Sequence, residues 1–349
     1  MCLVKKGVHS NMNKIFKVVW SKTKECYVVV SEVAKNNGGK KKVLASVLAG
    51  LAMVGAGAMG TPVHADVNLG NSAVNITPNG TYNGSNTVSK NSVVVGYQNN
   101  TAGGPSDESG KIAYGAANEA TRESSLAVGN QNHATNKSAS AIGVGNTASG
   151  EASVAMGNSS TASGDRSIAI GSGANATQGA ALAIGRQAEA TGSSAVALGY
   201  LNKATNNVAV GVGVNNKVSG EGATSVGSSN TVTGDNSSVL GRQNTVDGAS
   251  VAGAVAVGYK NKASGDRAIA IGEGNDSQKE DTITMGYNNT ASVGGAVAIG
   301  QDNVANSGGN AGNTMIAIGR QNEATAQDTI AIGREAKAEN DLSVAIGNR

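Results

Sequence analysis

Apolar and small residues alternate in front of regularly spaced glycines along most of the chain. The pattern is apolar, small, apolar, glycine, as in Leu126-Ala127-Val128-Gly129, Ile168-Ala169-Ile170-Gly171 and Ile330-Ala331-Ile332-Gly333. From about Ser89 onward these glycines, here called anchor glycines, recur with a 14-residue period in all but three of their intervals. The intervals that begin at Gly96, Gly241 and Gly300 are longer, and the phase resumes after each of them. The anchor glycines are Gly96, Gly115, Gly129, Gly143, Gly157, Gly171, Gly185, Gly199, Gly213, Gly227, Gly241, Gly258, Gly272, Gly286, Gly300, Gly319, Gly333 and Gly347.

Each 14-residue unit predicts two short strands and two turns. Alternation with period two is typical of a strand with one buried face, so we expect the apolar residues three and one before each anchor to face the core. The anchor glycine and a glycine seven residues later, such as Gly150, suit turns that need a positive φ or a close backbone approach. Asparagine lies three residues after the anchor in 13 of 17 units, as at Asn132, where it can adopt a left-handed φ or bond its own backbone. The unit is therefore one coil of an all-β solenoid.

Such a coil cannot bury its apolar face alone, so neighbouring coils are expected to stack with their strands paired in parallel and in register. A fully buried Ile or Val stabilises the fold by roughly 1.5–3 kcal/mol, whereas ordering the backbone costs about 1–2 kcal/mol per residue. Backbone ladders must therefore supply much of the stability, and further burial by association would add to it, which favours oligomerisation. The three lengthened intervals predict longer turns. Such turns suit a binding face, although neutral loop growth is the favoured explanation.

Residues 1–65 have the features of an export leader. Three lysines, Lys40 to Lys42, precede the uncharged and mostly apolar run 43–60, and small residues follow up to Ala65. A positive region, an apolar region and a small-residue site make a secretory signal, so we predict a helical signal segment and cleavage between Ala65 and Asp66. A transmembrane helix is the alternative, which the short run rich in Ala, Gly and Val disfavours.

Composition and charge narrow the function. Residues 1–65 carry ten Lys and two acidic residues, a charge of +8, whereas residues 66–349 carry 17 basic and 22 acidic residues, a charge of −5. An acidic body without a Lys/Arg cluster is a poor binder of phosphate backbones, so no nucleic-acid partner is expected. Cys2 and Cys26 both lie in the leader, and His133 is the one His of the body, so we expect no disulfide framework, no His/Cys metal site and no cofactor.

Two other functions compete with that of a surface-presenting solenoid. A secreted carbohydrate-active solenoid enzyme would need grouped carboxylates and would be expected to carry aromatic platforms, but the acidic residues are scattered and the body has neither Trp nor Phe. The second competing function is that of an ice-binding solenoid or a structural surface-layer solenoid, of which an ice binder would show flat ranks of Thr at one phase. Thr is frequent six residues after the anchor, as at Thr135, Thr177 and Thr191, but Ser replaces it irregularly. We therefore expect no catalytic residues and no enzyme activity.

Two groups of motifs resemble one known family. Met12-Asn13-Lys14-Ile15, Val18-Val19-Trp20-Ser21 and Val28-Val29-Val30-Ser31-Glu32 resemble the extended signal peptide region of large Gram-negative autotransporters. Units such as Ser167-Ile168-Ala169-Ile170-Gly171 and Ser343-Val344-Ala345-Ile346-Gly347 are similar to the YadA-like head of trimeric autotransporter adhesins. The expected organisation is an upstream start extension (1–11), an extended signal peptide region (12–39), the apolar and cleavage regions of the signal (40–65), an N-terminal segment (66–88) and head repeats (89–349).

This resemblance implies a left-handed parallel β-roll, a homotrimer and attachment to host extracellular matrix, host cells or other bacteria. It also implies export to the surface of a Gram-negative-type bacterium, with a coiled-coil stalk and a C-terminal membrane anchor. The chain ends at Asn348-Arg349 directly after a head unit. We therefore expect either a fragment of a longer product or a truncated product that is secreted, and trimer formation without the stalk stays open. The ligand-binding residues and the identity of the ligand are unknown from the sequence.

Overall fold

The computed structural model describes residues 16–21, 26–31, 65–68, 73–78, 86–104, 109–248, 251–307 and 314–349. The chain divides into two compact units, residues 1–61 and 62–349. In the first unit, β1 (Phe16–Ser21) pairs antiparallel with β2 (Cys26–Ser31). Consecutive β-branched valines favour strands in these two segments. The predicted helical signal segment, the apolar run 43–60, lies outside the described residues. No helix among the described residues is long and apolar enough to span a membrane.

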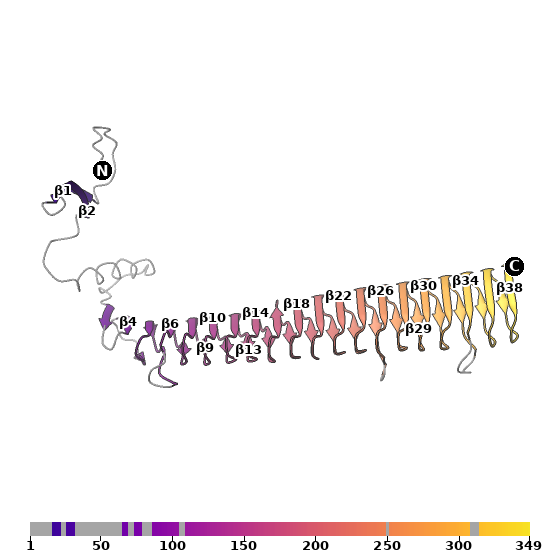
Figure 1. Cartoon of the computed structure of the whole chain (residues 1–349), viewed down its shortest axis with the longest axis horizontal. Helices are drawn as coiled ribbons and strands as arrows, with labels where there is room; N and C mark the ends of the chain where they lie inside the picture. Colours follow the sequence, from indigo (N-terminus) through magenta and orange to yellow (C-terminus); the bar gives the residue numbers. More distant parts are fainter. Residues whose placement is uncertain are drawn as a thin grey trace, which may run out of the picture. The chain divides into compact units, whose positions relative to one another are not determined.

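The second unit is a parallel solenoid that begins with a hairpin (Figure 1). Strand β3 (Ala65–Asn68) pairs antiparallel with β4 (Val74–Pro78), and β4 pairs in parallel with β5, the first long strand of the repeat. The predicted cleavage site, Ala65 and Asp66, lies at the start of β3. From β5 onward each coil contributes one long strand, and from β7 onward most also contribute a two-residue short strand.

The long strands are β5 (Val93–Tyr97), β6 (Ile112–Ala116), β8 (Leu126–Asn130), β10 (Ser140–Val144), β12 (Val154–Asn158), β14 (Ile168–Ser172), β16 (Leu182–Ile184), β18 (Val196–Tyr200), β20 (Val210–Val214), β22 (Thr224–Ser228), β24 (Ser238–Arg242), β26 (Val255–Tyr259), β28 (Ile269–Glu273), β30 (Ile283–Tyr287), β32 (Val297–Gln301), β34 (Ile316–Arg320), β36 (Ile330–Arg334) and β38 (Val344–Asn348). The short strands are β7 (Glu119–Ala120), β9 (His133–Ala134), β11 (Thr147–Ala148), β13 (Thr161–Ala162), β15 (Asn175–Ala176), β17 (Glu189–Ala190), β19 (Lys203–Ala204), β21 (Lys217–Val218), β23 (Thr231–Val232), β25 (Thr245–Val246), β27 (Lys262–Ala263), β29 (Asp276–Ser277), β31 (Thr290–Ala291), β33 (Val304–Ala305), β35 (Glu323–Ala324) and β37 (Lys337–Ala338).

Both sheets keep the phase of the sequence repeat. Each long strand pairs with the long strand of the next coil at equal phase, so Gly157 lies beside Gly171, and the short strands do the same. The register holds even across the lengthened intervals, where Gly96 pairs with Gly115 and Gly300 with Gly319. The predicted all-β architecture of parallel 14-residue coils is therefore confirmed.

The core between the two sheets consists mainly of alanine, and this overturns the predicted facing of the long strand. Ala169, two residues before its anchor, and Ala176 on the short strand are fully buried, whereas Ile168 and Ile170 are partly exposed. The apolar residues three and one before the anchor therefore point out of the coil, and the small residue between them points in. Because the 14-residue coil is so short, its two sheets lie too close together for two layers of large side chains.

Two kinds of glycine are needed for different reasons. At the anchor Gly213, φ is +118°, and a Cβ would collide with the carbonyl oxygen of Gly227 in the next coil. Gly150, seven residues after its anchor, has no positive φ, yet a Cβ there would collide with the carbonyl oxygen of Gly164. Residues other than glycine also adopt a left-handed φ at two positions of the coil. These positions lie two residues after the anchor and five before the next one, as at Gln131 and Ser138, both with φ of 55°.

The asparagines three residues after the anchor form a buried ladder along the solenoid rather than adopting a left-handed φ. The Asn132 side-chain amide donates to Asn118 Oδ1 at 3.0 Å, to the Val128 carbonyl at 3.0 Å and to the Gly143 carbonyl at 2.7 Å. Its backbone N–H also donates to Asn118 Oδ1. Each asparagine therefore closes its own turn, as predicted, and also bonds two neighbouring coils. The ladder runs over residues 99–146 and 202–322.

Candidate interaction surface

The outer side of the long sheet forms a continuous apolar face. It consists of the residues three and one before each anchor, which we call the outward apolar face; Leu240 is 53% and Met156 37% exposed there. Of these 36 positions, 33 are apolar, the exceptions being Ser140, Thr224 and Ser238. With strands about 4.8 Å apart, 18 long strands give a face about 80 Å long. Soluble monomers rarely expose a contiguous apolar patch of this extent, so the face has the character of an interface.

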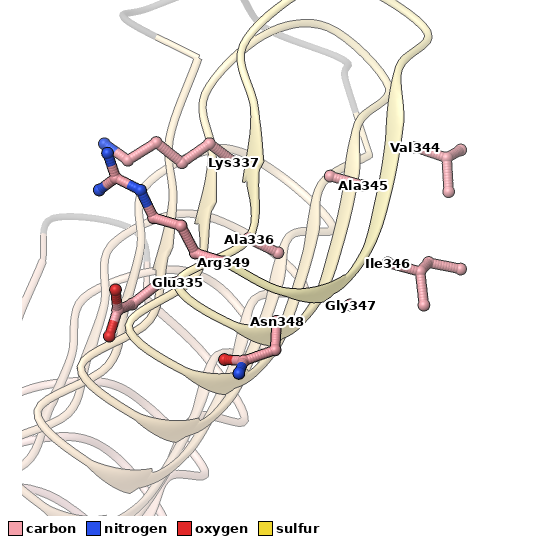
Figure 2. Close-up of a pocket in the computed structure, with 9 residues that line it drawn as sticks. All are labelled: Glu335, Ala336, Lys337, Val344, Ala345, Ile346, Gly347, Asn348 and Arg349. Carbon is pink, nitrogen blue, oxygen red and sulfur yellow. The ribbon is translucent and has the colours of Figure 1, made fainter.

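Figure 2 shows this division at the last coil. Ala336 and Ala345 lie between the two sheets, whereas Val344 and Ile346 point away from the coil interior. A cavity of about 500 Å³ lies at this end, where its lining combines apolar side chains with Glu335, among others. Because β38 pairs on one side with β36 within the described part of the chain, the cavity corresponds to a sheet edge.

The outer side of the short sheet is polar. Side chains four residues after the anchor form ion pairs between adjacent coils, with 2.6 Å between Lys203 Nζ and Glu189 Oε2 and 2.9 Å between Lys337 Nζ and Glu323 Oε2. His133 lies on β9, and its Nδ1 is 2.9 Å from Glu119 Oε2. Residues six after the anchor are Thr or Ser in nine successive coils, from 121 to 233. The solenoid therefore has one apolar and one polar face.

Basic and aromatic side chains meet on the turn that follows the long strand. Arg186 lies over the ring of Tyr200, with 5.4 Å to its centroid. Arg242 and Lys260 both lie over Tyr259, at 4.9 Å and 5.0 Å. Hydrogen bonding to Lys260, and secondarily to Arg242, lowers the pKa of the Tyr259 phenol. The contacts at Tyr259 hold two cations and an aromatic ring in one place on this turn.

The first lengthened turn is tied to the core by a lysine that sequence reasoning missed. Lys111 is buried, and its Nζ donates to the Gly103 carbonyl at 2.8 Å. Most other coils carry Ser or Ala at this phase, as at Ser125 and Ala139, so the departure from the column was the available signal. The tips of the lengthened turns, 105–108, 249–250 and 308–313, lie outside the described residues, and their role in binding stays a prediction.

The described residues contain no group of three or more His, Cys, Asp and Glu side chains placed to hold a metal ion. The anchor glycines, which were predicted to be structural, lie on or directly after the long strands, where most pair with the anchor glycine of the next coil. The surfaces that stand out, the outward apolar face and the polar face opposite it, are extended and repetitive. Such surfaces suit association and multivalent binding more than reaction at a single point.

Two protein-family models match the chain. The extended signal peptide of the type V secretion system matches residues 12–60, which indicates export. The YadA head domain repeat (2 copies) matches nine segments that together cover more than half of the chain: 120–146, 134–160, 148–174, 176–202, 219–244, 252–275, 278–303, 316–336 and 324–349. No curated protein matches the chain. The chain therefore belongs to the family of proteins with YadA-like head repeats, and it is similar to trimeric autotransporter adhesins.

Proposed function

We propose that this chain is the head of a bacterial surface adhesin that works as a homotrimer and binds host extracellular matrix, a cell-surface receptor or other bacteria without catalysis. The outward apolar face is the observation that carries the proposal, because it runs the length of the repeat and is opposed by a polar face. Association through the apolar face would leave the polar faces available to ligands.

The dimensions of the long sheet suit three copies. A five-residue strand spans about 16 Å, so three such sheets around an axis would each lie about 5 Å from it. That distance is half of the ~10 Å spacing between packed sheets, which apolar side chains fill. Four sheets would each lie about 8 Å from the axis, which is too far for Ile and Val side chains to meet. This geometry supports a trimer closed around its apolar faces.

Burial of the apolar face would strongly stabilise such a trimer. Most outward side chains are partly exposed, and Ile184 at 36% and Leu240 at 53% are among the more exposed ones. Burying about 40–60 Å² of each contributes about 1–1.5 kcal/mol at 25 cal/mol per Å². Many such side chains per protomer exceed the cost of association by a wide margin. Three equal polar faces on one particle would then bind a repetitive ligand with avidity rather than through a single strong site.

Oligomeric state tests the first part of the proposal. Sedimentation of the full chain is expected to give a trimer, and replacing four successive outward side chains by Ser is expected to shift it toward monomer with strand content retained. These changes are Ile170→Ser, Ile184→Ser, Leu198→Ser and Val212→Ser, and the native Ser140 and Ser238 show that the outward apolar face accepts Ser. Together the four changes remove about 4–6 kcal/mol of apolar burial per protomer. The matched control places Ser on the polar face: Thr147→Ser, Thr161→Ser, Thr231→Ser and Thr245→Ser.

Binding of the full chain to a panel of matrix proteins, host cells and bacteria tests the second part. The trimer is expected to bind at least one of them, and the variant with four outward serines to bind about 10–100-fold more weakly through lost avidity. A folded trimer that binds none of these targets would overturn the adhesive function.

A further inference from the structure

The long strands all begin on one side of the solenoid and all end on the opposite side. These two sides, here called the edges of the long sheet, carry opposite charge. We call the residues six and five before each anchor the leading turn, and the residues one and two after it the trailing turn. The leading turns carry ten acidic and four basic side chains, whereas the trailing turns carry six basic and three acidic ones. Both columns are largely solvent-exposed. The acidic and basic side chains next to the long sheet are therefore concentrated on opposite sides of it.

Eight of the ten acidic side chains of the leading turns are exposed: Glu151, Asp165, Glu221, Asp235, Glu280, Asp281, Asp328 and Asp341. Some aspartates also cap the preceding coil: Asp235 Oδ1 accepts the Glu221 N–H at 2.8 Å, and Asp165 Oδ1 accepts the Glu151 N–H at 2.9 Å. Accepting a backbone N–H leaves the carboxylate charged and its other oxygen available.

The basic residues of the leading turns are partly used within the chain. Lys137 Nζ lies 3.0 Å from Glu123 Oε2, and Arg267 bonds Asp281 at 2.7 Å. Both partners belong to the same leading-turn column. The acidic excess of this edge therefore remains after its internal pairs are formed.

The cations of the trailing turns are not neutralised in the same way. Arg186, Arg242 and Lys260 contact tyrosine rings. For these three and Arg320, the described part of the chain contains no ion pair with a carboxylate, whereas Arg334 pairs with its neighbour Glu335 at 3.3 Å. The contacts with tyrosine rings hold the guanidinium groups of Arg186 and Arg242 along the edge without neutralising their positive charge.

Rotational symmetry brings these two edges together. In a ring of parallel copies that points the long sheets at its axis, the contacts are heterologous, so the trailing edge of one copy meets the leading edge of the next. We infer that the trailing-turn cations of one chain bind the leading-turn carboxylates of the next chain in the trimer. This inference rests on the homotrimer proposed above and adds which residues close the ring.

Arg242 is the best-placed of these cations. The leading turn of its own coil carries Asp235, and that of the preceding coil carries Glu221. An axial offset of zero or one coil between protomers therefore still gives Arg242 a carboxylate. Exposed pairs are individually weak, but several per edge at three edges add up, and complementary edges also speed correct association.

Charge reversal in the full chain tests the inference. The trailing-edge variant carries Arg186→Glu, Arg242→Glu, Arg320→Glu and Arg334→Glu. The rescue variant adds three changes at carboxylates not used as backbone caps: Glu151→Lys, Glu221→Lys and Glu280→Lys. The matched control makes the same charge change on the polar face: Lys203→Glu, Lys217→Glu, Lys262→Glu and Lys337→Glu. Circular dichroism verifies that each variant retains its strands.

Sedimentation at low and high salt measures the chain concentration at which half of the chains are trimeric. At low salt the trailing-edge variant is expected to raise this concentration at least about tenfold and the rescue variant to return it to within about threefold of the original. The control is expected to change it less than about threefold, and high salt to shrink all differences. A trimer equally sensitive to the control and trailing-edge changes, or not rescued, would overturn this inference alone. An original chain that is monomeric throughout would instead overturn the homotrimer itself.

Discussion

Replacing Asn216 by alanine removes one rung of the buried asparagine ladder without adding any bulk. The Asn216 side-chain amide donates to Asn202 Oδ1 at 3.0 Å, to the Val212 carbonyl at 3.0 Å and to the Gly227 carbonyl at 2.9 Å. Its Oδ1 accepts the Asn230 backbone N–H at 3.1 Å and the Asn230 amide at 3.0 Å. The substitution therefore breaks the connection of one coil to the coils before and after it.

The expected loss of stability follows from the polar groups of the asparagine ladder that lose a hydrogen-bond partner. A buried donor or acceptor left without a partner costs about 1–3 kcal/mol. The Asn230 N–H and the Gly227 carbonyl together therefore predict a loss of about 3–4 kcal/mol. Steric strain does not contribute, because Ala174 and Ala188 occupy the same phase. Asn216→Ser is expected to cost less, because Ser160 shows that a hydroxyl at this phase still bonds the asparagine one coil earlier.

Urea unfolding of the full chain, followed by circular dichroism, measures the total effect. Repeat proteins also open locally, so hydrogen exchange at the Asn230 N–H locates it. A local loss of about 3 kcal/mol predicts exchange about 100-fold faster at that amide. Asn158→Ala is the matched control, because Asn158 is exposed on the trailing turn. The reasoning is refuted if Asn216→Ala costs no more than this control, or if exchange at Asn230 does not change.

Two further predictions concern the backbone and the trailing turn. Gly213→Ala is expected to abolish cooperative folding, because its Cβ would collide with the Gly227 carbonyl. Gly145→Ala should cost only about 1 kcal/mol, because its Cβ would make only an ordinary contact with Ser159 Oγ at 3.7 Å. Equal losses of thermal stability would contradict this contrast. The Tyr259 phenol is expected to ionise at lower pH than an ordinary tyrosine because of Lys260, and Lys260→Gln should raise its pKa again. Phenolate absorbance during alkaline titration measures this, and an unchanged midpoint in the variant would refute the assignment.

Periodicity alone carried the prediction of the repeat architecture. Residues of equal phase pair across coils, as Gly157 and Gly171 do, because a stack of equal coils turns sequence phase into sheet register. The lengthened intervals did not disturb this relation, since Gly241 still pairs with Gly258. Family motifs in the leader and the repeat were equally visible in the sequence, because they are local strings of residues.

The direction in which each side chain points was not visible. Alternation with period two states that a strand has two different faces, but the pattern is the same whichever face lies inside. Large residues such as Ile168 and Ile170 were therefore assigned to the core in place of Ala169. The role of Asn132 was also incomplete, because a ladder needs acceptors on the neighbouring coils as well as on its own turn.

The sequence by itself thus determined the period, the parallel register, the coil anatomy and the family of this protein. Only the tertiary structure decided that alanine fills the coil and that Ile, Val and Leu cover its outside. The physical reason is closure: two sheets joined by tight turns within one 14-residue coil leave room only for small side chains between them. In one coil, Val218 of the short sheet lies against Gly211 of the long sheet. The same closure turned the apolar pattern outward, which made it a surface for association.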